Sequence, residues 1–470
     1  MSEKEFPYID HIYHLQRENR LAIQRTTIKE RIQLLKKLEN EILLARDAIV
    51  DALHKDFRKS KIEAESTELF PVLSEIRLFI KNLKDWSASK SVSNNLVFFG
   101  SKAKIVYEPK GNCLIISPWN YPFQLAVVHL VACIAAGNTA IVKPSEFAPA
   151  TNQVLNSIFG KVFESNHVQL IYGEVEETTY LLSKKFDHIH FTGSPKVGKI
   201  VMAAGAKHLA SVTLELGGKS PLIIDGTLDI KTVVSKAIWG KLINNGQTCI
   251  APDYLLIKEE LKEEFISTFI QHMEKTFGKN PMESPDLARI INLRNFDRIQ
   301  SLVENAIDGG ANCPYGNEYV RSELYIKPTL LTDIPDDAEI LFEEIFGPVF
   351  PMITYQNIQE ITKFINDREK PLALYIYSKN QELIDFIVHN TSSGAVLVNE
   401  TLLHIMHPNL PFGGVNNSGI GRSTGRFGFE DFSHSKPVLQ VNQWFSPTKF
   451  INYPYTGFTQ KIVNLMMKYL

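Results

Sequence analysis

The segment CLIISPWNYPFQLAVVHLVACIAAGNTAIVK, residues 113–143, decides the fold. It contains a short apolar run closed by Pro118, a helical stretch over residues 123–136, and a second apolar run, AIVK (140–143), closed by Pro144. Short, continuous apolar runs are typical of parallel strands that are buried on both faces. The segment therefore predicts a strand–helix–strand unit of an α/β fold with a parallel sheet.

The same alternation extends toward the C-terminus. Apolar runs recur at VQLI (168–171), HIHFT (188–192) and VTLEL (212–216), and residues 197–208 have a helical pattern. A less regular alternation from about residue 220 to residue 398 predicts a second α/β domain.

Two flanking regions differ from this pattern. Residues 87–101 are polar and rich in Ser and Asn, which predicts a loop or arm, and VLQVNQWF (438–445) looks like a strand that forms a small sheet with it. Residues 8–83 are charged and periodic, which predicts helices. The apolar positions at three- and four-residue spacing are Ile28, Ile32, Leu35, Leu38 and Ile42.

Length and composition set broad limits. A chain of 470 residues is longer than one core usually supports, so we expect two or three domains. A formal net charge of -2 gives no support for a nucleic-acid partner, which requires a basic face. No apolar run is long enough to span a bilayer, and the first residues lack the apolar core of a signal peptide. We therefore expect a cytoplasmic protein.

The four cysteines show no CxxC spacing, which argues against a disulfide framework or a cysteine-rich zinc site. Cys113 and Cys133 lie in apolar runs, and Cys313 lies in a predicted loop. Cys249 differs, because it lies in NNGQTCIAPDY between glycine and proline, where a thiolate could attack a carbonyl group. From these residues alone, a small buried side chain is the alternative interpretation.

Two polar residues stand at predicted strand ends. Glu215 lies in the apolar segment LELGGKSP, where burial would raise the pKa of its carboxyl and suit it to act as a general base. Asn120 lies between two prolines in SPWNYPF, where its amide could donate to a developing oxyanion. A carboxylate bonded to nearby N–H groups and a turn-forming asparagine are the alternatives.

Glycines mark one candidate phosphate site. FTGSPKVGK (191–199) places Gly193 and Gly198 around the start of a predicted helix, with Ser194 as its cap. A helix N-terminus of this kind can bind a pyrophosphate, although the pattern is not GxGxxG. The glycines within residues 419–425 lack a preceding strand, and we interpret them as a flexible turn.

His188 and His190 alternate within one predicted strand. We expect no third ligand nearby, so we interpret them as core or edge histidines and expect no metal site.

Together these segments resemble the aldehyde dehydrogenase superfamily. SPWNYPF, KPSE, FTGSPKVGK, LELGGKSP, NNGQTCIAPDY, EEIFGPV and NLPFGGVNNSGIGR are similar to its signature segments, in the same order, over roughly residues 105–430. GQTCIAPDY and the ending FGFEDFSHSKPVL resemble the class 3, or fatty aldehyde dehydrogenase, branch. The resemblance implies a Rossmann-like cofactor domain, an α/β catalytic domain and a small β arm for oligomerisation.

The resemblance also implies the chemistry. Cys249 matches the nucleophile, Glu215 the general base, and Asn120 the oxyanion donor that acts with the N–H of Cys249. The implied reaction is NAD(P)-dependent oxidation of aldehydes, medium- or long-chain aliphatic or aromatic, to carboxylic acids. An acylating enzyme that uses coenzyme A and a non-catalytic member of the family are the alternatives. The presence of Glu215 argues against the first, and the presence of all three residues argues against the second.

The implied cofactor is NAD, with NADP as an alternative, and the implied substrate is a small-molecule aldehyde. Tyr121, Trp239 and Ile405 match positions that line the family's substrate tunnel. The residues that match its cofactor contacts are Trp119, Lys143, Glu146, Gly193, Ser194, Gly198, Gly217, Glu344 and Phe346.

We expect a homodimer with twofold symmetry. The apolar residues of the C-terminal tail have helical spacing, and we interpret the tail as docking on the body or on a partner subunit, with weak peripheral membrane contact as the alternative. The expected domain boundaries are 1–84 and 104–216 for the cofactor domain, 217–420 for the catalytic domain, 85–103 and 421–450 for the arm, and 451–470 for the tail.

Overall fold

The predicted strand–helix–strand unit is present. In the computed structural model, which describes residues 5–444 and 446–469, β3 (Asn112–Ile116), α6 (Pro122–Ala136) and β4 (Thr139–Lys143) follow one another. Strands β3 and β4 pair in parallel, as predicted. Helix α6 ends at Gly137, whose φ of 95° is a left-handed conformation that glycine adopts without steric cost.

A six-stranded sheet forms the centre of the first lobe. The five apolar runs quoted above all form strands, and their parallel pairing confirms the predicted sheet. The interpretation of residues 419–425 as a flexible turn was wrong in part, because Gly419 and Ile420 form a sixth strand antiparallel to β7. In spatial order the strands are β17 (Gly419–Ile420), β7 (Ser211–Leu216), β6 (His188–Gly193), β3, β4 and β5 (Val168–Leu170).

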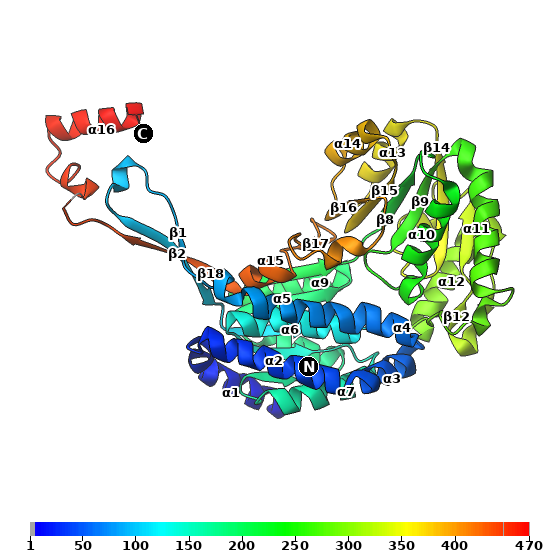
Figure 1. Cartoon of the computed structure of the whole chain (residues 1–470), viewed down its shortest axis with the longest axis horizontal. Helices are drawn as coiled ribbons and strands as arrows, with labels where there is room; N and C mark the ends of the chain where they lie inside the picture. The colour runs from blue at the N-terminus through cyan, green and yellow to red at the C-terminus, as the bar shows by residue number, and fades with distance from the viewer. Residues whose placement is uncertain (1–4, 445, 470) are drawn as a thin grey trace.

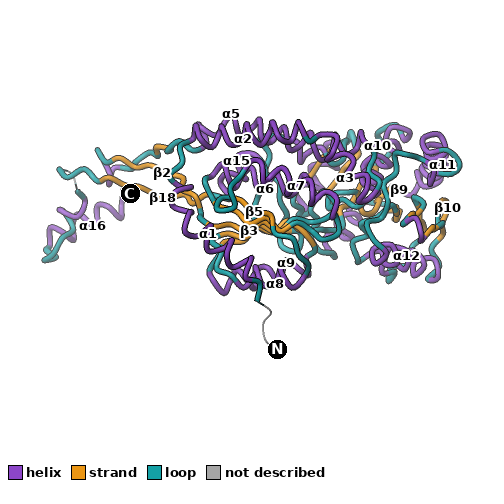
Figure 2. Tube along the Cα trace, turned by 90° about the horizontal axis from the view of Figure 1, so that it is seen from below, coloured by secondary structure: helices purple, strands orange, loops and turns teal. Residues whose placement is uncertain are grey.

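Helices cover both faces of this sheet, and the helices predicted over residues 8–83 are confirmed. The helices are α1 (Pro7–Gln24), α2 (Ile28–Leu44), α3 (Arg46–Phe57), α4 (Lys61–Ala64), α5 (Phe70–Trp86), α7 (Pro149–Val162), α8 (Val175–Ser183) and α9 (Pro195–His208), with a π-helical turn at Glu65–Leu69. Figure 2 shows α2 and α5 on one side of the strands and α8 and α9 on the other.

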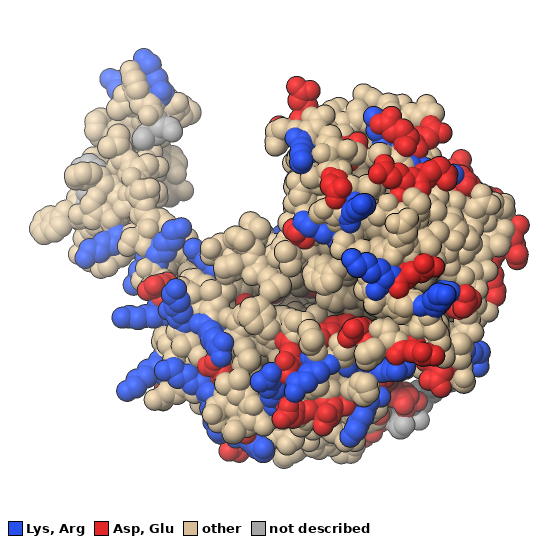
Figure 3. All heavy atoms as spheres, turned by 45° about the vertical axis from the view of Figure 1, so that its right-hand side comes forward, with Lys and Arg blue, Asp and Glu red and all other residues tan. Residues whose placement is uncertain are grey.

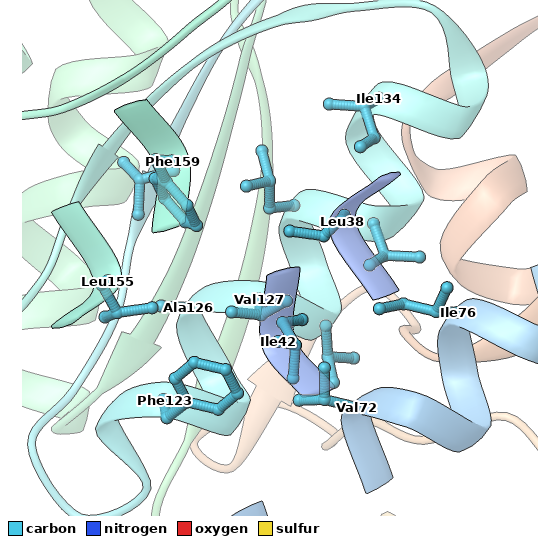
Figure 4. Packing of buried hydrophobic residues seen from close by; sticks show 14 of the residues in the cluster. Leu38, Ile42, Val72, Ile76, Phe123, Ala126, Val127, Ile134, Leu155 and Phe159 are labelled. Atoms are coloured by element: carbon cyan, nitrogen blue, oxygen red, sulfur yellow. The ribbon is translucent and has the colours of Figure 1, made fainter. Parts of the chain in front are cut away.

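The main core lies between the sheet and the helices α2, α5, α6 and α7 (Figure 4). Of the predicted face of α2, Leu35, Leu38 and Ile42 are completely buried. Ile28 and Ile32 pack against the same cluster at its edge. This core fixes β3 and α6, and therefore the loop between them that carries Asn120.

The second lobe is the second α/β domain that the sequence predicts. Its seven-stranded sheet is parallel except for the edge strand β10. In spatial order the strands are β10 (Asn312–Tyr315), β13 (Thr329–Thr332), β14 (Val349–Tyr355), β9 (Pro252–Lys258), β8 (Ser220–Ile224), β15 (Ala373–Tyr377) and β16 (Ala395–Val398). Its helices are α10 (Ile230–Leu242), α11 (Lys262–Phe277), α12 (Leu293–Asp308), α13 (Ile358–Asn366) and α14 (Gln381–Asn390), and a small ribbon joins β11 (Tyr319–Val320) to β12 (Tyr325–Ile326).

A three-stranded arm projects from the first lobe (Figure 1). It consists of β1 (Lys90–Ser91), β2 (Lys102–Pro109) and β18 (Ser433–Gln440), so the predicted small sheet is present. The strand predicted at 438–445 begins earlier and ends at Gln440, and Phe445 lies outside the described residues. Strand β2 runs beyond residue 103, and β17 pairs with the first lobe, so the domain boundaries stay a prediction.

Two helices flank the arm in the chain. Helix α15 (Gly425–Asp431) packs on α6 and α5, whereas α16 (Gly457–Tyr469) lies at the tip of the arm, away from both lobes (Figure 1). Within the described residues, no helix has the length and apolar character needed to cross a membrane.

Candidate active site

The predicted catalytic residues come from both lobes. Asn120 follows β3 and Glu215 lies near the end of β7, so both stand at the carboxyl edge of one sheet, where open α/β sheets bind ligands. Cys249 comes from the second lobe, between α10 and β9. The surface is hollowed where the two lobes meet (Figure 3).

The backbone before Cys249 has an unusual conformation. Asn244, Asn245 and Gly246 have φ values of 51°, 53° and 77°, a run of three left-handed residues. Asparagine and glycine tolerate this region better than other residues do. A Cβ on Gly246 would lie 2.2 Å from the carbonyl oxygen of Gly347, so the NNG sequence is what allows this turn.

The thiol of Cys249 is half-buried and faces two carboxyl groups. Burial raises its pKa to about 12, and the charges of Glu344 and Glu215 add to the rise. The N–H groups of Cys249 and Ile250 point at the sulfur and partly offset these effects. Negative charge at this atom is therefore stabilised by backbone donors, which are also positioned near any oxyanion that forms there.

Asn120 is buried and contacts the segment that leads to Cys249. Its Nδ2 donates to the carbonyl of Gln247 at 3.1 Å. Its own carbonyl accepts from Nδ2 of Asn244 at 2.8 Å and from Nζ of Lys59 at 3.4 Å. These bonds hold the amide beside the cysteine, although the two residues come from different lobes.

A buried ion pair supports this contact. Nζ of Lys59 lies 2.8 Å from Oε1 of Glu68, and both side chains are fully buried. Oε2 of Glu68 accepts from the N–H of Gln124 at 2.8 Å, at the start of α6. Glu63 accepts from the N–H of Asn244 at 2.7 Å, and burial raises the pKa of this carboxyl to about 7.

Glu215 is almost completely buried. Burial raises the pKa of its carboxyl to about 8; the hydrogen bond from Ser423 opposes this rise, and the charge of Asp431 adds to it. Oγ of Ser423 donates to Oε1 at 2.8 Å. A carboxyl group with a pKa near 8 suits proton transfer close to neutral pH, as the sequence predicted.

Glu344 faces the same space from the second lobe. The N–H of Gly218 donates to its carboxylate, but burial and the charge of Asp253 together raise the pKa of Glu344 to about 8. A Cβ on Gly217 would lie 2.0 Å from Oε2 of Glu344, so any larger residue here would displace that carboxylate. Phe346 has a φ of 50°, and its ring lies edge-on to Trp119 with centroids 5.4 Å apart.

Lys219 and Asp253 hold the loop that carries Glu344. Lys219 pairs with Asp253 and donates to the carbonyls of Ile340 at 2.8 Å and Glu343 at 2.9 Å. Oδ2 of Asp253 accepts from the N–H of Ile345 at 2.9 Å. The GGKSP and APDY segments therefore fix the EEIFGPV segment in space.

The histidine pair has a neighbour that the sequence interpretation missed. His188, His190 and Asp431 place three potential ligand atoms within 4.8 Å of one another, so the statement that no third ligand stands nearby was wrong. Both oxygens of Asp431 accept from Oγ1 of Thr213, at 2.8 and 2.7 Å. We interpret this cluster as a hydrogen-bonded network within the core.

A model of the aldehyde dehydrogenase family matches residues 8–438. The chain belongs to the aldehyde dehydrogenase family. It is 42% identical over 416 residues to 4,4'-diaponeurosporen-aldehyde dehydrogenase of Staphylococcus aureus, covering 88% of this chain and 90% of that protein. It is 43% identical over 412 residues to aldehyde dehydrogenase family 3 member A2 of Macaca fascicularis, covering 88% of this chain and 84% of that protein.

The fold is also that of the family. The solved structure described as the substrate-bound state of Staphylococcus aureus AldH is similar with a TM-score of 0.93 and 39% identity, covering 97% of this chain and 99% of that chain. The predicted family, its class 3 branch and the aldehyde dehydrogenase fold are therefore confirmed. The enzyme is an oxidoreductase that acts on aldehydes.

Several predicted cofactor contacts of this aldehyde dehydrogenase fall into two groups, one around Lys143 and Glu146 and one at the start of α9. Nζ of Lys143 lies 3.4 Å from Oε2 of Glu146, and Glu146 lines a cavity of about 490 Å³ together with residues of the α7 and α8 regions. Ser194 caps α9 by accepting from the N–H of Val197. A Cβ on Gly198 would lie 2.7 Å from Leu216, so glycine lets α9 pack close to β7.

The predicted tunnel residues have different environments. Tyr121 is buried, and its hydroxyl lies 2.6 Å from Oγ1 of Thr248, beside Cys249. Ile405 and Cys249 both pack against the main core of the second lobe. Trp239 is 47% exposed, so it lies at the surface rather than deep in a tunnel.

Sequence reasoning missed several residues of the aldehyde dehydrogenase site. Ser423 directly follows the NLPFGGVNNSGIGR segment, but a serine beside a glycine-rich turn carries no sign of its partner. Tyr375 lies in an apolar strand, and its hydroxyl donates to the carbonyl of Ile250 at 2.5 Å. Lys59 and Glu68 did not stand out in the sequence, because the N-terminal helices contain many other charged residues. Only their full burial distinguishes them from solvent-exposed pairs.

Proposed function

We propose that this enzyme oxidises aldehydes to carboxylic acids through a covalent thioester on Cys249, with NAD or NADP as the hydride acceptor. The observation that carries the proposal is the position of the thiol. The charge of Glu215 acts on the thiol and helps to raise its pKa, and the amide of Asn120 donates to the carbonyl of Gln247, two residues before the cysteine. A nucleophile, a base and an oxyanion donor are thus brought to one place.

Cys249 attacks the aldehyde carbon and forms a thiohemiacetal. A thiol whose pKa is raised to about 12 must lose its proton as it attacks, and Glu215 and Glu344 are the carboxylates that face it. The oxyanion of the adduct accepts hydrogen bonds from the Asn120 amide and the N–H of Cys249. Because both donors are fixed before the reaction begins, they cost little reorganisation when the charge develops.

The residues present fit a nicotinamide dinucleotide. The cavity beside Glu146 is large enough for an adenosine ribose, and the Ser194-capped start of α9 is a helix N-terminus, which can bind a pyrophosphate. Glu344, Phe346 and Trp119 would hold the nicotinamide end. When bound, the nicotinamide accepts the hydride that leaves the thiohemiacetal carbon. Glu146 favours NAD through the ribose hydroxyls, whereas Lys143 would tolerate the 2′-phosphate of NADP.

Glu215 completes the cycle by hydrolysis. It removes a proton from a water molecule that attacks the thioester carbon; the C–S bond breaks, and the carboxylic acid leaves. Transfer of the acyl group to coenzyme A would not need this base, so its presence disfavours an acylating enzyme. The presence of Cys249, Glu215 and Asn120 together disfavours a non-catalytic role.

We infer a long or bulky apolar aldehyde as the substrate. Tyr121 lies beside Thr248, Ile405 packs against the same core cluster as Cys249, and Trp239 exposes apolar surface; all three match tunnel positions of the family. The relative from Staphylococcus aureus is named for a long polyene aldehyde, and other relatives belong to the family 3 branch. Initial rates with NAD and with NADP, on aliphatic aldehydes of rising chain length, test cofactor and substrate together.

The variant Cys249→Ser tests the covalent mechanism. We expect no NAD(P)H production with decanal while NAD still binds, as followed by calorimetry. Cys313→Ser is the matched control, because Cys313 is a half-buried cysteine of the second lobe and should leave the rate unchanged. Full activity of Cys249→Ser, or turnover that depends on coenzyme A, would contradict the proposal.

We infer that the arm pairs with a second copy of the chain. β18 is an edge strand of eight residues with unpaired backbone groups on its outer side, which readily add a further strand. Leu96, Phe99 and Leu439 expose apolar surface on the same arm. Light scattering after size-exclusion chromatography should give a dimer for the native chain and a monomer for Leu439→Asp. A native monomer would overturn this inference.

Helix α16 offers a second contact. It exposes Phe458, Leu465, Met467 and Tyr469, and it does not dock on the lobes of its own chain. A partner subunit is the occupant that we propose, and weak peripheral contact with a membrane is the alternative. Flotation with anionic vesicles, with and without residues 457–470, separates the two. Flotation of the full chain but not of the truncated chain would support contact with a membrane.

A further inference from the structure

One face of the strands β6 and β7 carries a row of polar side chains inside the first lobe. Alternate residues of a strand point to the same side, so each strand contributes three neighbours to this face. On β7 the exposed fraction falls along the row, from an exposed Ser211 to a Glu215 that is 4% exposed. The facing pairs in the parallel register are His188 and Ser211, His190 and Thr213, and Thr192 and Glu215.

Asp431 lies across the middle of this row. Its carboxylate accepts from Oγ1 of Thr213, and its Oδ2 lies 3.3 Å from Nε2 of His188 and 3.9 Å from Nδ1 of His190. Burial raises the pKa of Asp431, but the contacts with the two histidines and the charge of Lys110 bring it well below the ordinary value. Asp431 therefore stays ionised and can accept a proton only transiently.

The outer end of the row reaches the surface. Nδ1 of His188 lies 2.9 Å from Oγ of Ser211 and 3.2 Å from Nζ of Lys110. Ser211 and Lys110 both line a surface pocket of about 400 Å³. The contacts from Asp431 to the surface therefore pass through His188, whose Nε2 lies 3.3 Å from Asp431 without forming a hydrogen bond in this structure.

The inner end approaches the base. Oγ1 of Thr192, Oε2 of Glu215 and both ring nitrogens of His190 are buried and have no hydrogen-bond partner among the described residues. Buried polar atoms almost always have a partner, and ordered water is the usual one where protein groups do not meet. One water between these atoms would join Glu215 to the groups around Asp431.

Charged and titratable groups surround both ends of this path. The charges of Asp431 and Arg422 act on Glu215, and the charge of Glu215 acts on Cys249. The ring of His129 stacks on His190 with centroids 3.8 Å apart, and burial holds the pKa of His129 well below its ordinary value. His129 is therefore neutral, and its ring has one nitrogen that donates a hydrogen bond and one that accepts.

We propose that this polar row carries the proton of Glu215 to the surface at Ser211 and Lys110, and so regenerates the base after each hydrolysis. The proposal rests on the proposed function. In hydrolysis, the water loses a proton to Glu215, its oxygen bonds to the acyl carbon, and the sulfur leaves. The proton then passes from Glu215 through the bridging water to the His190, Thr213 and Asp431 group. From there the proton reaches His188 and then solvent, and the side chains of the row return to their original protonation states. Thr213 and Asp431 act through Glu215 and are positioning residues.

Stopped-flow assays of Thr213→Val and Asp431→Asn with NAD and decanal test this proposal. The first burst of NADH reports acylation and should keep the native amplitude and rate. Steady-state turnover reports hydrolysis and should fall by about fivefold or more, because the base recovers slowly. In Asp431→Asn the acidic limb of the pH profile should also move to lower pH, because a negative charge that raises the pKa of Glu215 is removed.

Glu430→Gln is the matched control, because Glu430 lies on the same helix and bonds Arg426 and Tyr107 instead. If the buried variants do not fold, Ser211→Ala changes the exposed end alone and should still slow steady-state turnover by about twofold or more. Turnover and pH profiles equal to those of the native enzyme in the folded variants, or in Ser211→Ala, would overturn the relay. A native enzyme that forms no NADH from any of the aldehydes tested would instead contradict the proposed function.

Discussion

The hydroxyl of Ser423 donates to Oε1 of Glu215 at 2.8 Å, although 208 residues separate the two in the chain. The contact depends on β17, which pairs with β7 and places Gly419 opposite Glu215. The backbone N–H and carbonyl of Ser423 are both bonded to Phe412, at 2.7 and 3.2 Å. The hydroxyl is therefore fixed before the base acts.

Ser423→Ala should move the pH profile of hydrolysis to higher pH. The hydrogen bond stabilises the carboxylate and lowers its pKa, so losing it raises the pKa of Glu215 above about 8. A bond to a charged group is worth about 1.5–3 kcal/mol, which corresponds to about 1 to 2 pKa units. Since the base acts as the carboxylate, steady-state turnover at pH 7 should fall about tenfold or more and recover as the pH rises. An unshifted acidic limb would show that the bond does not act on the base.

Glu215→Gln should trap the thioester. The glutamine cannot accept a proton from water, so hydrolysis should slow by about a hundredfold or more, which is the usual share of a general base. We expect one equivalent of NADH per subunit and an added acyl mass on the peptide that contains Cys249. The double variant with Cys249→Ser should carry no such mass. Rapid steady turnover of Glu215→Gln would mean that another group activates the water.

Much of the fold could be predicted because its strands are short apolar runs closed by Pro or Gly. CLIIS and AIVK are buried on both faces, so their composition alone identifies them. The strands of the arm were harder to predict from the sequence, because β18 is exposed along most of its length and lacks the apolar character of the core strands. The predicted strand therefore begins and ends too far toward the C-terminus.

The candidate site was predictable where a residue is unusual for its local sequence. Glu215 is unusual because it is a carboxylate within an apolar strand. Cys249 is unusual because it follows the turn-forming residues NNG. Ser423 and Asp431 do not, since a serine in a turn and an aspartate in a short helix are ordinary. Their roles come from β17 and α15 folding back on the first sheet, and that long-range contact leaves no local pattern.

Lys59→Met should destabilise the first lobe strongly. Lys59 and Glu68 are both fully buried, so the variant leaves the charge of Glu68 without a partner, a change that costs about 3–5 kcal/mol. Lys61→Met is the matched control, because Lys61 lies 3.8 Å from Asp47 on the surface and such pairs contribute about 1 kcal/mol or less. The midpoint of urea unfolding, followed by circular dichroism, should fall clearly for Lys59→Met alone. Equal midpoints for both variants would contradict the assigned role of the buried pair.

Gly217→Ala should weaken cofactor binding more than it changes stability. The added Cβ would lie 2.0 Å from Oε2 of Glu344, and this carboxylate is the flexible end of a side chain that can move aside. The displaced carboxylate would no longer be placed to accept from the nicotinamide ribose. We expect the Kd for NAD, measured by calorimetry, to rise about tenfold, which is about 1.4 kcal/mol.

Gly160→Ala provides the comparison for this variant. Gly160 lies in α7, and no atom would lie within 4 Å of its new Cβ. Alanine in a helix interior is favoured over glycine by about 1 kcal/mol, so this variant should be as stable as the native enzyme or more so. Its Kd for NAD should be unchanged. If Gly217→Ala also bound NAD with native affinity, Glu344 would not be a cofactor contact, and the nicotinamide end would depend on Phe346 and Trp119.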